Sequence, residues 1–290
     1  MDYKKILAYA QRNVLQILIG LVAVAFFIIL IPSFFRASQV TVGLNDVIIR
    51  DSPSRKSAKI GTLKQGQRVS LVRKDDVTDW DKIRFSDTKT GWIPSWLTNT
   101  QFKKGQQAIP LSEATIVIDP GHGGTDSGAL GINPKHEEKK YTLRTSKEIY
   151  KKLSATGARV VLTRTTDTFV SLAARPKLAN KLDADAFISI HYDSSGDDNM
   201  GTGDTTYYYH QGPSVQLGKD INSELTTKIP LYNRGVRYAN YQVLRDNKRP
   251  AILVEGGYIN SRNDFKEISS SDYPSRVASA VTAGLAKFIK

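Results

Sequence analysis

Cysteine is absent from this chain of 290 residues, and histidine is scarce, with four residues in all. Without thiols the protein has no disulfide framework and no thiolate metal site. Any metal ion must therefore be held by histidine and carboxylate side chains. The four histidines are the first residues to follow in a search for metal-dependent chemistry.

Acidic residues are outnumbered: 28 aspartates and glutamates face 41 lysines and arginines, which gives a formal net charge of +13. Such an excess suggests an anionic surround, with nucleic acid, a membrane surface and an anionic cell-wall polymer as candidates. The sequence contains no recognition helix, RNA-binding motif or basic stripe with interleaved aromatics, so we expect no nucleic-acid partner. A generally basic surface without a specific partner is the alternative.

Polar residues are almost missing from residues 14–31, where Gln16 is the single exception. Eighteen residues are close to the length that a helix needs to cross a bilayer. We expect a transmembrane signal anchor over residues 14–32. A cleaved signal peptide is the alternative, but bulky Phe34 and Phe35 stand where a cleavage site needs small residues.

The charges around this segment predict its orientation. Basic side chains that flank a span stay on the cytoplasmic side. We therefore expect a single-pass membrane protein, with residues 1–13 in the cytoplasm and the residues after the anchor outside the cell. Three basic residues precede the segment and one follows it closely: Lys4, Lys5, Arg12 and Arg36.

Residues 39–98 have short strand-like runs at regular spacing, separated by Gly, Asp and Pro turns. This pattern is typical of a small all-β barrel. All three tryptophans of the chain lie here, at positions 80, 92 and 96. They either fill the core of this domain or form an exposed aromatic groove for a glycan or peptide.

This segment resembles the bacterial SH3 domain family. The matching stretches are residues 46–54 (DVIIRDSPS), 61–69 (GTLKQGQRV) and 91–97 (GWIPSWL). Asp51 and Pro94 depart from the family pattern. The resemblance implies binding to the cell wall, although such a domain can equally be a spacer or a partner-binding module.

Residues 99–113 are polar and basic with little periodicity, and we expect a linker. From residue 114 to residue 290, strand-like and helix-like segments alternate. Such alternation predicts an α/β domain with an open, mostly parallel sheet flanked by helices. The helices are expected at 138–154, within 171–182 with a kink or a late start at Pro176, near 214–229 and near 273–289.

Three apolar runs end in residues suited to metal chemistry: TIVIDPGH at His122, AFISIH at His191 and AILVE at Glu255. Continuous apolar runs of this length are typical of buried parallel strands. Catalytic groups of open α/β sheets collect beyond the carboxyl ends of the strands, so these side chains are expected at one rim. Two imidazoles and a carboxylate are the ligand set of a catalytic zinc.

A further ligand has several candidates in HEEKK, which supplies His136, Glu137 and Glu138 at the start of a predicted helix. One of them could face the metal while the others are solvated. The alternative is that these acidic residues only complement the helix dipole.

Taken together, these stretches resemble the zinc-dependent N-acetylmuramoyl-L-alanine amidases. The resemblance covers residues 114–290. Its departures are modest, and among them Asp193 adds a negative charge where the family usually has Asn. The matching stretches are 116–124, 126–129, Glu138 and Lys139 with Leu143, 157–164, Arg175 with Ala179 and Asn180, 189–191 and 250–258.

The resemblance implies that Zn²⁺ is bound by His122, Glu138 and His191, and that Glu255 is the catalytic base. It also implies hydrolysis of the amide between N-acetylmuramic acid and the L-alanine of the stem peptide in peptidoglycan. The residues by themselves support only metal-assisted amide or ester hydrolysis. Two alternatives stay open: a zinc peptidase that cuts within the stem peptide, and a non-catalytic wall-binding protein.

The expected anchor adds two hypotheses. The catalytic domain would stay close to the membrane and act on membrane-proximal peptidoglycan. Because no autoinhibitory helix is visible in the sequence, control would come from elsewhere, for example from an integral membrane partner that packs on residues 14–31.

Overall fold

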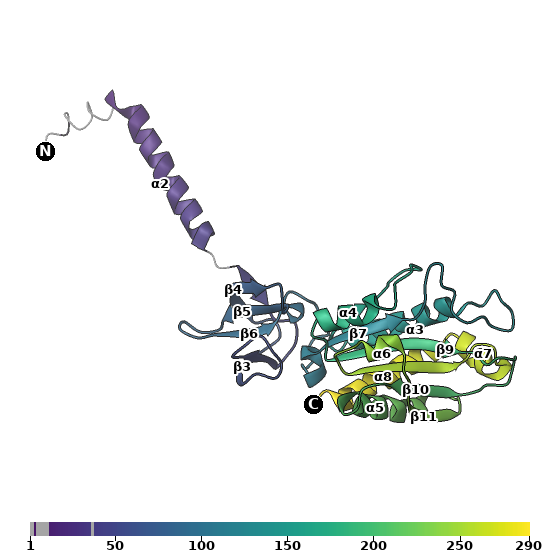
Figure 1. The fold of residues 1–290 in the computed structure, drawn as a ribbon. Coiled ribbons are helices and arrows are strands. Elements are labelled where there is room, and N and C mark those ends of the chain that lie inside the picture. Colours follow the sequence, from purple (N-terminus) through teal and green to yellow (C-terminus); the bar gives the residue numbers. More distant parts are fainter. Residues whose placement is uncertain (1–2, 4–11, 36–37) are drawn as a thin grey trace.

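The computed structural model describes residue 3 and residues 12–35 and 38–290 of the chain. Figure 1 shows an N-terminal helix, a small β domain and a larger α/β domain in chain order. Most of residues 1–13, the expected cytoplasmic segment, lie outside the described residues.

Helix α2 (Val14–Phe35) contains the apolar segment that suggested an anchor. In residues 12–35 and 38–290, no helix is both long and apolar enough to cross a membrane.

The small domain is a six-stranded antiparallel sheet with the strand order β1-β4-β5-β6-β2-β3. Alternate residues of its strands point inward and form a core around Val47, Ile49, Ile83 and Ile93. The strands are β1 (Gln39–Thr41), β2 (Val47–Arg50), β3 (Lys59–Leu63), β4 (Arg68–Asp75), β5 (Trp80–Arg84) and β6 (Thr90–Pro94), followed by the 3-10 helix η1 (Ser95–Leu97).

The three tryptophans do not form an open groove. Trp80 and Trp92 are buried. Arg73 and Lys82 lie over the ring of Trp92, at 5.0 and 5.8 Å from its centroid. Trp96 packs edge-on against Trp80, with 6.2 Å between the ring centroids. Of the two interpretations of these residues, packing within the protein is the one observed.

The large domain is built on a second six-stranded sheet with the order β11-β10-β12-β9-β7-β8. Neighbouring strands are parallel except for β10 and β12, so the expected mostly parallel sheet is observed. The strands are β7 (Thr115–Pro120), β8 (Arg159–Leu162), β9 (Ala186–Asp193), β10 (Asp204–Tyr208), β11 (Asn233–Tyr238) and β12 (Ala251–Tyr258).

Helices cover both faces of this sheet because its strands are apolar on both sides. Successive side chains of a strand point to opposite faces. Ile116 and Ile118 therefore join the core under α3, α5 and α8, whereas Val117 joins a second core with α4 and α6. The helices are α3 (Glu138–Ser154), α4 (Ala174–Lys181), α5 (Pro213–Lys228), α6 (Gln242–Arg245), α7 (Arg262–Ser269) and α8 (Tyr273–Phe288).

Pro176 explains the late start of α4. The helix begins at Ala174, which places Pro176 in the first turn. The backbone N–H groups of a first turn have no partner inside the helix, so a proline there removes no hydrogen bond. Strands β10 and β11 were not expected, because their sequences DTTYY and NRGVRY lack a continuous apolar run.

The small domain contacts the amino-terminal ends of the parallel strands. Arg55 forms an ion pair with Asp185, directly before β9, at 2.5 Å. Arg159, the first residue of β8, pairs with Asp79 and lies over the ring of Trp96. The indole Nε1 of Trp96 donates a hydrogen bond to the carbonyl oxygen of Ser112 at 2.9 Å. The two domains therefore meet at one defined edge of the large sheet.

The segment expected to be a linker is packed against both domains. The backbone N–H of Asn45 donates to Gln106, and that of Ala108 donates back to Asn45. Leu111, in the 3-10 helix η2 (Pro110–Glu113), is buried in the core of the large domain. The polar composition of residues 99–113 therefore does not correspond to an unpacked linker.

One buried carboxyl predicts how stability depends on pH. Asp204 is fully buried, and this burial raises its pKa to about 7 although Asn233 donates a hydrogen bond to it. An unfolded chain loses this proton near pH 4, so the folded state binds more protons between about pH 4 and pH 7. The free energy of unfolding contributed by this group therefore falls as pH rises through that window.

We expect Asp204→Asn to remove this pH-dependent fall in the free energy of unfolding. The variant should match the parent chain near pH 4 and exceed its free energy of unfolding by up to about 4 kcal/mol at pH 8. Denaturant unfolding of the full chain at several pH values measures the difference, with Asp220→Asn on α5 as the control. Parallel stability profiles of parent and Asp204→Asn would contradict the assignment.

Candidate active site and metal centre

The turn after β7 places His122 above the carboxyl edge of the sheet. His122 has a positive φ of 59°, an uncommon conformation for a residue with a side chain. Two buried arginines hold the turn by donating to its carbonyl groups. Arg164 donates to the oxygens of Pro120 and Gly121, and Arg175 donates to those of Pro120 and His122.

Asp119 balances the charge of one of these arginines. It is fully buried at the end of β7 and forms an ion pair of 2.8 Å with Arg175. The hydroxyl groups of Thr163 and Ser189 also donate to Asp119, at 2.5 and 2.7 Å. A buried charge is tolerated when it is paired and hydrogen-bonded, and this one links β7 to β9, to α4 and to the residue after β8.

Glu138 enters the site from the first turn of α3, where a carboxylate also suits the helix dipole. Its Oε1 accepts hydrogen bonds from the backbone N–H of Tyr192 at 2.9 Å, and its Oε2 accepts one from Ala129 at 2.9 Å. These bonds aim both oxygens of the buried carboxylate toward the two histidines.

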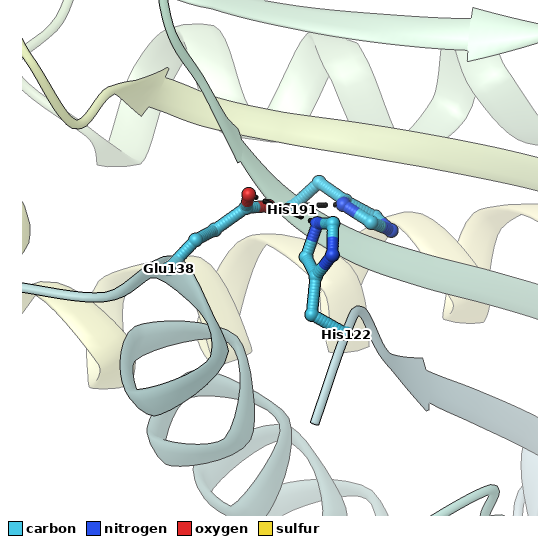
Figure 2. A group of neighbouring side chains, drawn as sticks. All are labelled: His122, Glu138 and His191. Carbon is cyan, nitrogen blue, oxygen red and sulfur yellow. Dashed lines mark hydrogen bonds and ion pairs between the residues drawn. The ribbon is translucent and has the colours of Figure 1, made fainter. Parts of the chain in front are cut away.

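Figure 2 shows His122, Glu138 and His191 converging from a turn, a helix and a strand. The Nε2 of His122 lies 2.9 Å from Oε2 of Glu138, and the Nδ1 of His191 lies 2.9 Å from Oε1. One ligand atom from each residue lies within 4.8 Å of the others. Two imidazole nitrogens and a carboxylate fit the ligand set of a catalytic zinc, so the structure brings together the three expected ligands.

Asp126 orients His122 and was missed by sequence reasoning. Its Oδ2 lies 2.9 Å from Nδ1 of His122, and its Oδ1 accepts a hydrogen bond from Gly128 N. The carboxylate favours a proton on Nδ1 and leaves Nε2 for a ligand, as outer partners of metal-bound histidines do. Only its place four residues after His122 in a glycine-rich turn could have indicated this role.

Two glycines allow the close packing of this cluster. A Cβ on Gly121 would lie 2.3 Å from Cε1 of His191, and one on Gly128 would lie 2.6 Å from Oε2 of Glu138. Gly128 also has a positive φ of 68°. Both positions therefore exclude a side chain.

This packing shifts the pKa values of Glu138 and His122. Burial alone raises the pKa of Glu138, but hydrogen bonds and charges from His122 and His191 overcome it and hold the pKa well below the usual range. Burial lowers the pKa of His122, whereas Glu138 and Asp126 raise it, and the net shift is upward.

Glu255 lies on β12 next to His191 of β9 in the parallel ladder. The carboxyl is buried, and its Oε2 has no hydrogen-bond partner among the described residues. Burial raises its pKa well above the ordinary value, with smaller contributions from Glu138 and Asp193. This carboxyl is therefore separate from the cluster of three and suited to holding a proton.

The remaining candidates lie outside the cluster. Glu137 pairs with Lys140 at 2.8 Å. His136 contacts the hydroxyl of Tyr141 at 2.8 Å and packs against the ring of Phe265. His210 lies near the carbonyl oxygen of Arg245.

A cavity of about 350 Å³ contains His122, Glu138, His191 and Glu255 in its wall. Apolar and aromatic side chains form much of the rest, including Leu172 and Tyr241, which come from loops and gave no signal in the sequence. Asp193 also lines this cavity. The full wall further includes Asp126, Ala129, Arg175, Tyr192, Ser194, Gln242, Val243 and Leu253.

Residues 116–287 match the family model described as N-acetylmuramoyl-L-alanine amidase. The chain belongs to this family. It is therefore a peptidoglycan amidase, as the resemblance implied. Residues 45–99 of this amidase match the bacterial SH3 domain, which confirms the second resemblance.

Relatives of this amidase are found among staphylococci. The probable cell wall amidase LytH of Staphylococcus epidermidis is 36% identical over 254 residues, which cover 86% of this chain and 84% of the relative. LytH of Staphylococcus aureus is 37% identical over 242 residues, which cover 82% and 80% of the two chains.

Solved structures show the same catalytic fold. An N-acetylmuramoyl-L-alanine amidase from Clostridium difficile 630 aligns with a TM-score of 0.59 at 32% identity, covering 60% of this chain and 96% of that one. The catalytic domain of CwlV from Bacillus (Paenibacillus) polymyxa aligns with a TM-score of 0.59 at 35% identity, covering 61% and 99%.

We predict that Gly121→Ala weakens metal binding. The added Cβ would overlap the ring of His191 and displace its Nδ1 from the cluster. Zinc affinity of the full chain, measured by competition with a chromophoric chelator, should fall by at least about tenfold. Gly196→Ala is the matched control, because nothing lies within 4 Å of its Cβ position. Equal zinc affinity in both variants would disprove the packing argument.

Proposed function

We propose that this amidase is zinc-dependent, with the metal bound by His122, Glu138 and His191, and that Glu255 is the catalytic base. The bond cut is the amide between the lactyl group of N-acetylmuramic acid and L-alanine of the stem peptide. The observation that supports this proposal most directly is a cavity lined by the His-Glu-His cluster and by a buried carboxyl whose Oε2 has no hydrogen-bond partner among the described residues.

Each residue has a defined task in this proposal. When bound, zinc supplies a Lewis acid that lowers the pKa of water to about 7 and polarises the amide carbonyl. Glu255 accepts the proton of the attacking water at Oε2 and passes it to the leaving amine. Its raised pKa favours the first transfer, because its carboxylate is a stronger base than that of an exposed glutamate.

The other residues of the cavity position and shield the reaction. Asp126 keeps Nε2 of His122 directed at the cluster. Apolar walls such as Leu172 and Val243 limit the water around the reacting groups, which strengthens electrostatic interactions there.

We expect Glu255→Gln to lower kcat by roughly 100- to 10,000-fold while leaving zinc affinity unchanged, since only the proton acceptor is removed. The full chain is incubated with peptidoglycan, with and without a zinc chelator, and the muropeptides are identified by mass spectrometry. The parent should release intact stem peptides with a free L-alanine amine, and chelation should stop this release. Cleavage within the stem peptide, or full activity of Glu255→Gln, would refute the proposal.

We also propose that the N-terminal segment anchors the protein in the cell membrane with the catalytic domain outside. The sequence supports this through its apolar residues 14–31 and the basic residues before them. In α2, Leu15, Ile19 and Val22 are each more than 60% exposed. An anchored enzyme would act on membrane-proximal peptidoglycan.

A membrane partner that packs on residues 14–31 belongs to the same proposal. It is supported by analogy: the CwlD amidase of Clostridioides difficile, 27% identical with a TM-score of 0.58, was solved in complex with the GerS lipoprotein.

Anchoring predicts a specific response to charge. Val22→Arg combined with Phe26→Arg should move the protein from the membrane fraction to the soluble or medium fraction, because each arginine costs about 3 kcal/mol within a span. Leucine at the same two positions is the control and should remain in the membrane pellet after carbonate extraction. Soluble parent protein, or membrane retention of the arginine variant, would disprove anchoring.

A further inference from the structure

The edge where the two domains meet carries a series of adjoining hollows lined by basic side chains from both domains. Their volumes are about 210, 680 and 470 Å³. The first two share Arg55, Lys56 and Arg249, and the last two share Lys248 and Arg249. We call this surface the junction groove and define it by Arg55, Lys56, Lys181, Lys248 and Arg249.

Among the described residues, the junction groove has more basic side chains than acidic partners to neutralise them. Arg55 is paired with Asp185, and Arg249 is paired with Asp183. Two further acidic residues line these hollows: Glu113 is paired with Arg50 outside them, and Asp246 is paired with Arg245. The exposed side chains of Lys56, Lys181 and Lys248 have no ion-pair partner among the residues that the structure describes.

Three unpaired lysines around one concave surface repel each other, and low-dielectric walls on both sides focus their potential. An anion that contacts all three relieves this repulsion. Lysine is a common point-charge ligand for phosphate groups. The groove therefore fits an extended anion with several charges better than a single small ion.

We propose that the junction groove binds a flexible, single-chain polymer that carries phosphate groups, of the kind found in an anionic cell-wall environment. The three lysines are spread over adjoining hollows, so a flexible chain can follow the groove and contact them in turn. A double-stranded nucleic acid is too wide and stiff to enter hollows of these volumes.

The junction groove lies at the sheet edge opposite to the active site. Asp185 precedes β9, and His191 lies six residues further along this strand, about 20 Å away. A polymer in the groove therefore does not compete with the stem peptide for the catalytic cavity. It contacts both domains at once and gives the excess positive charge of the protein a defined partner.

The test measures binding of fluorescently labelled linear poly(glycerol phosphate) to the full chain in uncharged detergent, over a range of salt concentrations. The groove variant combines Lys56→Glu, Lys181→Glu and Lys248→Glu. The control variant combines Lys147→Glu, Lys151→Glu and Lys266→Glu, which make the same change of net charge on exposed lysines elsewhere.

We expect the groove variant to lose at least about tenfold in affinity and roughly 2 units of the slope of log K against log salt, since three phosphate contacts disappear. The loss in log K of the control variant should be less than about a third of the loss in the groove variant. Both variants should hydrolyse a small soluble muropeptide at the parent rate. Loss of polymer binding with unchanged hydrolysis would show that the groove acts independently of the proposed amidase chemistry.

Other outcomes would overturn the proposal. Equal losses in the two variants would mean that the polymer senses only net charge. Unchanged affinity of the groove variant would place binding elsewhere. Vesicles of phosphatidylglycerol that bind the parent as tightly as the polymer, with the same loss in the groove variant, would identify a membrane surface as the partner instead.

Discussion

The catalytic site depends on how the chain leaves strand β7. The turn from Pro120 to His122 directs carbonyl oxygens into the protein, and these buried acceptors need donors. Arg164 and Arg175 supply them, and Asp119 neutralises Arg175 from the end of the same strand. Because a guanidinium has five donors in a rigid plane, one side chain can bond several carbonyl groups at once. These hydrogen bonds stabilise the turn in which His122 adopts its positive φ.

Around this turn, each ligand is fixed by a different backbone element and by a different kind of contact. Asp126 orients His122, Gly121 provides room for the ring of His191, and backbone N–H groups aim the oxygens of Glu138. Glu255 is the exception, because its Oε2 lacks such a partner among the described residues. These contacts would hold the proposed metal ligands in a fixed geometry, whereas the carboxyl that we propose exchanges protons is not held in this way.

The sequence predicts the strands and the rim well because burial on both faces produces continuous apolar runs. Ile116, Ile188 and Ile252 belong to such runs, and the residues that end them meet at one edge. The antiparallel strand β10 was not predictable in this way, since its buried residues Asp204, Thr205 and Thr206 are polar. Choosing Glu138 over Glu137 needed the resemblance, because composition treats the two neighbours alike. Tyr241 and Leu172 reach the cavity from loops, whose course depends on tertiary contacts that no local pattern encodes.

The contact between the small domain and the amino-terminal strand ends has a mechanical consequence. The small domain and the catalytic cavity occupy opposite ends of the same strands, and the segment between the domains is packed rather than slack. The packed junction therefore fixes the distance between the start of the small domain at Gln39 and the catalytic cavity. If the proposed anchor holds the chain, the depth at which the enzyme cuts would depend on the thickness of these two folded domains.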